Sequence, residues 1–205
     1  MLDVTGRLIV IIGGGGVAAR KARGLIEAGA SKIRIVSPSF RADIPEGVER
    51  VMERYEARHL DGAGLVFVAT DSAETNDAVV LEARRRGVLV NRADGDDANP
   101  GDFSTPAMTR QGAIVVTVSA AGSPALAALV RDGIASRFDP RWRAMAEAMG
   151  RLRPMILASG MSAEQRREAF MALATEEALD VLAKGGRDGL GRWLMERFEG
   201  LRHEN

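Results

Sequence analysis

The first part of the chain alternates short apolar runs with segments of helical periodicity. Residues 7–12 form a run that is continuously apolar after its first residue and stops at four consecutive glycines, Gly13 to Gly16. Such an uninterrupted run predicts a strand buried on both faces of a parallel sheet. Apolar residues then recur at helical spacing over 16–29, and 33–36 predicts a second strand. This order predicts a strand, helix, strand unit of a parallel sheet.

The same alternation continues through the first half of the chain. Further strands are expected at 48–52, 65–69 and 88–90, with a helix over 73–86 before the last of them. Residues 91–102 are rich in Asp, Gly, Asn and Pro and carry no apolar face. They predict a loop at the surface or along a cleft.

The second half of the chain has a different pattern. Two apolar segments, 103–108 and 113–118, flank a turn that contains Gly112, which predicts a hairpin. Ser123 and Pro124 are typical of a helix start, as N-cap and first helical residue. The sequence therefore predicts an α/β protein in which a Rossmann-type parallel sheet is followed by a mixed dimerisation segment and a small helical domain. The expected bounds of the three parts are 1–102, 103–140 and 141–205.

Apolar positions of helical period fill the tail from Asp139 onward. Three helices are expected there, of which the middle one begins at Ser162, because Gln165 three residues later completes a capping box. The apolar stripe of this middle helix is expected to run from Phe170 to Leu182.

Composition excludes several classes of protein. The 205 residues carry 28 basic and 28 acidic side chains, so no net charge favours nucleic acid or an anionic membrane. The absence of cysteine excludes disulfides and thiolate metal sites. Apolar runs are much shorter than the roughly 20 residues of a membrane span. We therefore expect a cytoplasmic protein with neither a nucleic-acid nor a membrane partner.

The glycine turn has the spacing of a dinucleotide fingerprint. Gly13, Gly15 and Ala18 follow a buried strand and open a helix, the context in which the backbone approaches a pyrophosphate. The helix N-terminus then faces the diphosphate with unpaired N–H groups. Arg20 and Lys21 lie early in this helix, where the helix dipole disfavours cations, so a ligand or carboxylate is expected near them.

The end of the second strand lacks the acidic residue that usually holds the adenosine ribose. Ser37 and Pro38 stand there instead. Either serine and backbone groups hold the ribose of NAD, or Arg34 or Arg41 binds the 2′-phosphate of NADP.

Several particular motifs follow one another along the chain: Gly13-Gly14-Gly15-x-Val17-Ala18-x-Arg20-Lys21, Ala69-Thr70-Asp71 with Asn76, Val90-Asn91-x-x-Asp94, Asp102-Phe103-x-x-Pro106-Ala107 and Ser123-Pro124-Ala125. In this order they resemble the precorrin-2 dehydrogenase family, the NAD-dependent part of siroheme synthase, over about residues 5–135. The resemblance implies a Rossmann domain, an intertwined dimerisation domain that makes a homodimer, and a small helical domain.

The resemblance also implies an activity, the oxidation of precorrin-2 to sirohydrochlorin with NAD⁺. Bifunctional members of the family then insert ferrous iron to give siroheme. Asp94 is expected to be the catalytic carboxylate and Ser123 a substrate contact. No metal ligands are assigned, although Asp94 would accept the pyrrole protons if iron is inserted. The residues expected to contact the cofactor are Gly13, Gly15, Gly16, Val17, Ser37, Pro38, Thr70, Asp71 and Asn91.

Two departures from the family pattern lie near the expected substrate cleft. The loop 95–101 is about two residues longer than usual, and segment 119–124 is about one residue shorter. A non-enzymatic dinucleotide-sensing module is the alternative function. An ordinary small-substrate dehydrogenase is disfavoured, because the chain has no cysteine and no Tyr-x-x-x-Lys, and its two histidines, His59 and His203, stand in no motif of such chemistry.

Overall fold

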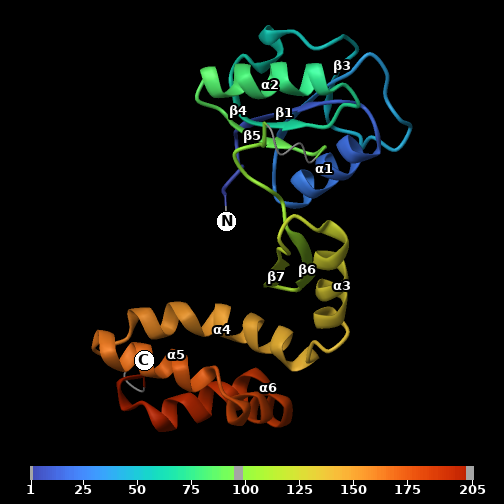
Figure 1. Cartoon of the computed structure of the whole chain (residues 1–205). Coiled ribbons are helices and arrows are strands. Elements are labelled where there is room, and N and C mark those ends of the chain that lie inside the picture. Colours follow the sequence, from blue (N-terminus) through green and yellow to red (C-terminus); the bar gives the residue numbers. More distant parts are fainter. Residues whose placement is uncertain (1, 95–98, 202–205) are drawn as a thin grey trace. The chain divides into compact units, whose positions relative to one another are not determined.

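The computed structural model describes residues 2–94 and 99–201, and the chain divides into two compact units, 1–105 and 106–205. The first unit is a five-stranded parallel sheet with strand order β3-β2-β1-β4-β5 (Figure 1). Its strands are β1 (Leu8–Ile12), β2 (Lys32–Val36), β3 (Glu49–Val51), β4 (Ala63–Val68) and β5 (Leu89–Arg92). Its helices are α1 (Gly16–Glu27), α2 (Ala73–Arg85) and the 3₁₀ turn η1 (Ala57–Leu60). This confirms the predicted Rossmann-type sheet.

Strand β1 is buried on both faces, as its apolar run predicts. Ile9 and Ile11 pack in the core beneath α1, whereas Val10 and Ile12 pack in the core beneath α2. All four side chains are essentially inaccessible to water. Because burial of one such side chain contributes about 1.5–3 kcal/mol, the two cores hold both helices firmly on the sheet.

The glycine turn joins the carboxyl ends of three strands. Gly13 has φ of +121°, and its N–H donates to Val36 O at 2.9 Å. A Cβ on Gly13 would come within 2.2 Å of Ala69 O, immediately after β4. Only glycine allows this approach. The turn therefore gathers the ends of β1, β2 and β4 at one edge of the sheet.

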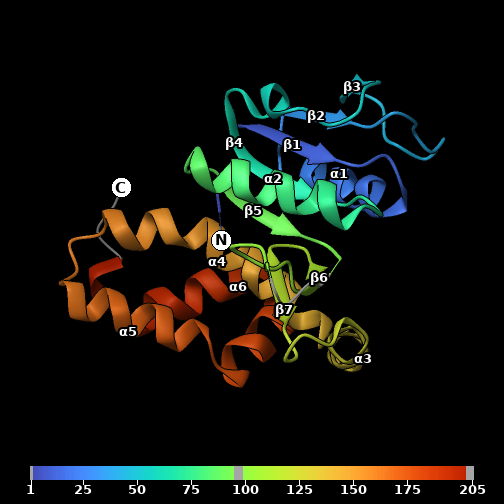
Figure 2. The same cartoon turned by 45° about the horizontal axis from the view of Figure 1, so that its top comes forward.

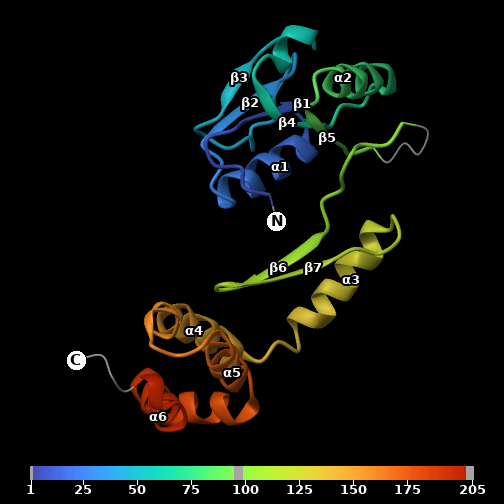
Figure 3. The ribbon, with the colours of Figure 1, turned by 90° about the vertical axis from the view of Figure 1, so that its left-hand side faces the viewer.

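The second unit begins with the predicted hairpin and helix. Strands β6 (Ala107–Gln111) and β7 (Ile114–Val118) pair antiparallel, and α3 (Pro124–Ala135) lies along them (Figure 3). Ser123 caps α3, and its Oγ accepts from Leu126 N at 3.3 Å. Both the hairpin and the helix start are confirmed.

The tail is helical, but its helix boundaries differ from the expected ones. It contains α4 (Pro140–Ala158), α5 (Ala163–Leu173), α6 (Glu176–Arg197) and the 3₁₀ turn η2 (Glu199–Leu201), which surround one apolar core (Figure 2). The capping box that starts α5 is confirmed. The expectation that this helix continues to Leu182 is wrong, because Thr175 caps a new helix by accepting from Ala178 N at 3.3 Å. Helix α6 then continues across a kink at Gly186.

No helix in the described part of the chain combines the length and apolarity needed to cross a bilayer. The division of the second half into separate domains at residue 140 stays a prediction.

Candidate functional site

The glycines of the turn have different tasks. A Cβ on Gly14 would come within 2.0 Å of Ser39 O, so this glycine is required for packing. A Cβ on Gly15 or Gly16 would meet no atom closer than 3.9 Å. Gly15 is also the N-cap of α1, where no side chain caps the helix and no acidic residue lies in the first turn. Open space in front of uncapped helix N–H groups is the geometry that binds an anion.

The first turn of α1 places further predicted cofactor contacts. Gly16 is the first residue of α1, and Val17, which follows it, is half-buried. Ser37 lies directly behind the glycine turn, since its Oγ would be 2.7 Å from a Cβ on Gly14. Ser37 and Pro38 thus follow β2 at the same edge of the sheet as the uncapped helix.

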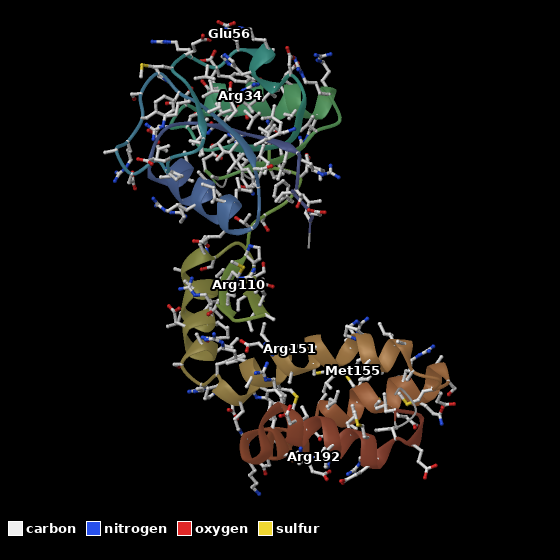
Figure 4. All side chains as sticks on the ribbon, turned by 180° about the vertical axis from the view of Figure 1, so that it is seen from behind. Arg34, Glu56, Arg110, Arg151, Met155 and Arg192 are labelled. Carbon is white, nitrogen blue, oxygen red and sulfur yellow. The ribbon has the colours of Figure 1, made fainter. Side chains whose placement is uncertain are left out.

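The structure distinguishes the two arginines considered for a 2′-phosphate. Arg34 donates to Glu49 Oε2 at 3.0 Å and to His59 O at 3.4 Å, so it is bound within the fold of the first unit (Figure 4). Arg41 lies beside Gly16, and its Nε donates to Asp43 Oδ1 at 3.0 Å. Only Arg41 of this pair is therefore near the glycine turn.

A polar network joins the ends of β4 and β5. Thr70 Oγ1 donates to Asn76 Oδ1 at 2.6 Å, and Asn76 Nδ2 donates to Asp94 Oδ2 at 2.7 Å. Arg92 binds the other side of Asp94, with Nε at 2.6 Å from Oδ1 and Nη2 at 3.0 Å from Oδ2. Asp71, by contrast, is exposed and makes no hydrogen bond within the described chain.

Arg92 holds this network from inside the protein. Its side chain is 1% exposed, and Nη1 also donates to Asp77 Oδ1 at 2.5 Å and to Asn99 O at 3.0 Å. The bidentate hydrogen bonds to Asp94 raise the pKa of Arg92 above its ordinary value, against the effect of burial. A bidentate arginine favours the ionised carboxylate. Since 29% of the Asp94 side chain is exposed, an oriented negative charge faces outward at the end of β5.

Asn76 and Arg92 were not among the expected site residues. A sequence signal exists for Asn76, since it lies with Val79, Val80 and Ala83 on the buried face of α2, where a polar residue needs a partner. A signal also exists for Arg92, which lies two residues after the apolar Val90 in a buried strand. Because an unpaired charge is costly there, a carboxylate partner is expected.

The remaining predicted residues lie apart from this network. Asn91 is 3% exposed in β5, and its Nδ2 donates to Phe103 O at 2.7 Å. Ser123 belongs to the second unit, where its observed role is the cap of α3.

Residues 1–107 match the model of a family described as "Putative NAD(P)-binding". The chain belongs to this NAD(P)-binding family. Family membership agrees with the uncapped α1 terminus and the open space at Gly15, which fit the pyrophosphate of a dinucleotide.

Relatives of the NAD(P)-binding chain bear out its resemblance to siroheme synthase. It is 33% identical over 204 residues to siroheme synthase 2 of Aeromonas hydrophila. The matched region covers 97% of this chain and 43% of the relative. It is 34% identical over 209 residues to a siroheme synthase of Stutzerimonas stutzeri, with the same coverage of both proteins. The chain thus spans less than half the length of these curated relatives.

A solved structure of SirC, a precorrin-2 dehydrogenase, shares the fold. It matches with a TM-score of 0.78 and 22% sequence identity, and the match covers 96% of this chain and 98% of that one. A Rossmann-type sheet followed by a helical C-terminal region therefore occurs in another protein.

Proposed function

We propose that this chain is an NAD-dependent precorrin-2 dehydrogenase, which oxidises precorrin-2 to sirohydrochlorin. One observation supports this most strongly. The oriented carboxylate of Asp94 and the uncapped N-terminus of α1 lie at the same carboxyl edge of the sheet. Ligands of open α/β sheets bind at this edge. The activities for which its relatives are named, siroheme synthase and precorrin-2 dehydrogenase, support the choice of substrate.

In this proposal each part of the site has a separate task. The N–H groups at the start of α1 hold the pyrophosphate, and Gly15 leaves room for it. Ser37 and Pro38 lie against the adenosine ribose, and Thr70, Asp71 and Asn91 contact the rest of the cofactor. NAD⁺, when bound, accepts the hydride.

Asp94 acts on the macrocycle rather than on the cofactor. Its carboxylate stabilises the positive character that develops as hydride leaves, and it takes up the proton that the macrocycle releases. Arg92 and Asn76 hold the carboxylate in one orientation, so the charge needs no rearrangement during the reaction.

The substitution Asp94→Asn tests this role. The amide keeps the shape of the side chain but removes the negative charge and the proton acceptor, so precorrin-2 oxidation should fall by about 100-fold or more. NAD⁺ affinity by calorimetry should stay near that of the wild type. Asp96→Asn and Asp97→Asn, which lie outside the described residues, change the charge of the same loop equally and serve as controls. Equal losses in all three variants, or full turnover by Asp94→Asn, would contradict the assignment.

We further propose that the chain forms a homodimer through the hairpin and α3. Within residues 106–135, all of which the structure describes, only Ala127 is buried. Helix α3 exposes a set of large apolar side chains, Leu126, Leu129, Val130 and Ile134. A two-stranded hairpin with so little core is not stable alone, so a second copy is expected to cover it.

Light scattering tests the dimer. Wild-type protein at micromolar concentration should have the mass of two chains. Leu129→Glu should shift the protein towards monomer, whereas Leu81→Glu on the exposed face of α2 should not. A monomeric wild type, or a dimer unaffected by Leu129→Glu, would refute this interface.

Iron insertion and a cytoplasmic location stay predictions. Within the described residues no three His, Cys, Asp or Glu side chains gather where they would hold a metal ion. A product assay that separates sirohydrochlorin from its iron complex decides whether Asp94 also serves a chelatase. Binding of NADH without any oxidation of precorrin-2 would instead favour the dinucleotide-sensing module.

A further inference from the structure

The ammonium of Lys21 in α1 contacts two neutral side chains. Its Nζ lies 5.2 Å from the centroid of the Phe67 ring and donates a hydrogen bond to Thr105 Oγ1. The Phe103 ring packs edge-on against Phe67, with 5.7 Å between the centroids. Although the chain is rich in acidic residues, Lys21 makes no ion pair with any described carboxylate. The positive charge is thus half-buried, with no counter-ion among the residues that the structure describes.

This environment disfavours the charged form of the amine. Burial is the main cause that lowers the pKa of Lys21 to about 8, and the neighbouring Arg20 lowers it further. Thr105 and Phe67, which face the ammonium from the other packed segments, are neutral. A half-buried lysine without an anionic partner makes the free protein less stable. Such a cost is common at residues that serve ligand binding.

A second polar group in the same cluster lacks a partner. Asn91 pairs in register with Phe67, so both side chains lie on the α1 side of the sheet. The Asn91 Nδ2 group donates to Phe103 O, but the buried Oδ1 has no hydrogen-bond partner within residues 2–94 and 99–201. Because most buried polar atoms are bonded, this orphaned oxygen independently suggests that a ligand enters the cluster. As an acceptor it takes an N–H donor, as the assigned cofactor contact of Asn91 would supply, so the ammonium of Lys21 is left for an anionic group.

The cluster lies at the ligand edge of the sheet. Phe67 and Asn91 are the penultimate residues of β4 and β5, and Asn91 precedes Asp94 by three residues, at most about 10 Å of chain. We propose that Lys21 binds a carboxylate of the substrate and so fixes the macrocycle relative to Asp94. The inference rests on the proposed function, since precorrin-2 carries carboxylate side chains.

Steady-state kinetics with matched lysine variants test this binding role. Lys21→Gln should raise the KM for precorrin-2 by about tenfold or more, the usual effect of losing a charged hydrogen bond, while the KM for NAD⁺ stays unchanged. Lys21→Arg should largely restore the KM. Lys32→Gln removes the same charge from an exposed lysine without described partners and should behave as wild type.

The pH profile separates a binding ammonium from a structural one. Carboxylate binding needs the protonated amine, so the wild-type KM for precorrin-2 should rise above about pH 8, the pKa of Lys21 in the free protein. Lys21→Arg should show no such rise. A flat wild-type profile would refute the proposal.

Two further readouts distinguish the alternatives. If the only role of Lys21 is its hydrogen bond to Thr105, then Lys21→Met and Thr105→Val should both lower the melting temperature. We expect instead that Lys21→Met leaves the melting temperature unchanged or raises it. Weaker NADH binding by Lys21→Gln in calorimetry would assign the residue to the cofactor and overturn the proposal. If the wild type fails to oxidise precorrin-2, quenching of protein fluorescence by sirohydrochlorin still tests Lys21. Equal affinities of Lys21→Gln and Lys32→Gln would then refute it.

Discussion

Replacing Gly15 by aspartate should change stability and cofactor binding in opposite directions. Gly15 has φ of −85° and ψ of −169°, an extended conformation that any residue adopts, and a Cβ there meets nothing within 4 Å. Aspartate is a preferred N-cap, and α1 has no side-chain cap of its own. The free protein should therefore gain a few tenths to about 1 kcal/mol of stability from the cap and the helix dipole.

The same carboxylate should repel the pyrophosphate. Two unit charges about 5 Å apart interact by about 3 kcal/mol at an effective dielectric constant of about 20. Salt and solvent reduce this repulsion at an open site. We therefore expect Gly15→Asp to weaken NAD⁺ binding by at least about tenfold.

Calorimetric titration with NADH and thermal melting of the free protein measure the two effects. Gly15→Asn provides the cap without the charge, so the difference between the two variants isolates the electrostatic part, which should shrink as salt rises. Wild-type affinity in Gly15→Asp would show that the pyrophosphate does not lie at this helix terminus. A melting temperature lowered by several degrees would show instead that Gly15 serves the fold.

Three other substitutions have defined outcomes. Gly14→Ala should destabilise the protein by about 2 kcal/mol or more in urea unfolding, because its Cβ would overlap Ser39 O at 2.0 Å. Arg92→Met should cost about 3 kcal/mol of stability, since it leaves Asp94 without its buried partner. Hydrogen bonds from Asn99 and Arg92 hold the pKa of Asp77 below its ordinary value, so acidification below about pH 4, where an unfolded Asp takes up its proton, should destabilise the wild type more than Arg92→Met. Ala121→Gly should raise the melting temperature by a few degrees, because Ala121 has φ of +40°.

The sequence predicts the first unit well because its signals are local. The apolar run of β1, the glycine turn and the helical spacing after it each report on neighbouring residues, and the structure confirms all three. The prediction of a single helix across the boundary between α5 and α6 is wrong because it also used only local spacing. Apolar spacing continues across it, and only the cap provided by Thr175 marks the new helix.

The site is predicted less completely because its bonds join distant residues. The position of Asp94 after a strand is visible in the sequence, but its hydrogen bond from Asn76 spans 18 residues. The burial of Arg92 depends on Asp77, 15 residues away. Likewise, Gly13 to Gly16 look equivalent as a run, and only the approach of Ala69 and Ser39 distinguishes the packing glycines from the open ones.

The proposed activity is the transfer of hydride from precorrin-2 to NAD⁺. Purified protein should be mixed under anaerobic conditions with precorrin-2 and NAD⁺, while NADH and sirohydrochlorin are measured separately. We predict that the two products appear in equal amounts and that Asp94→Asn slows both by about 100-fold or more. A protein that binds NADH but forms neither product would contradict the assignment.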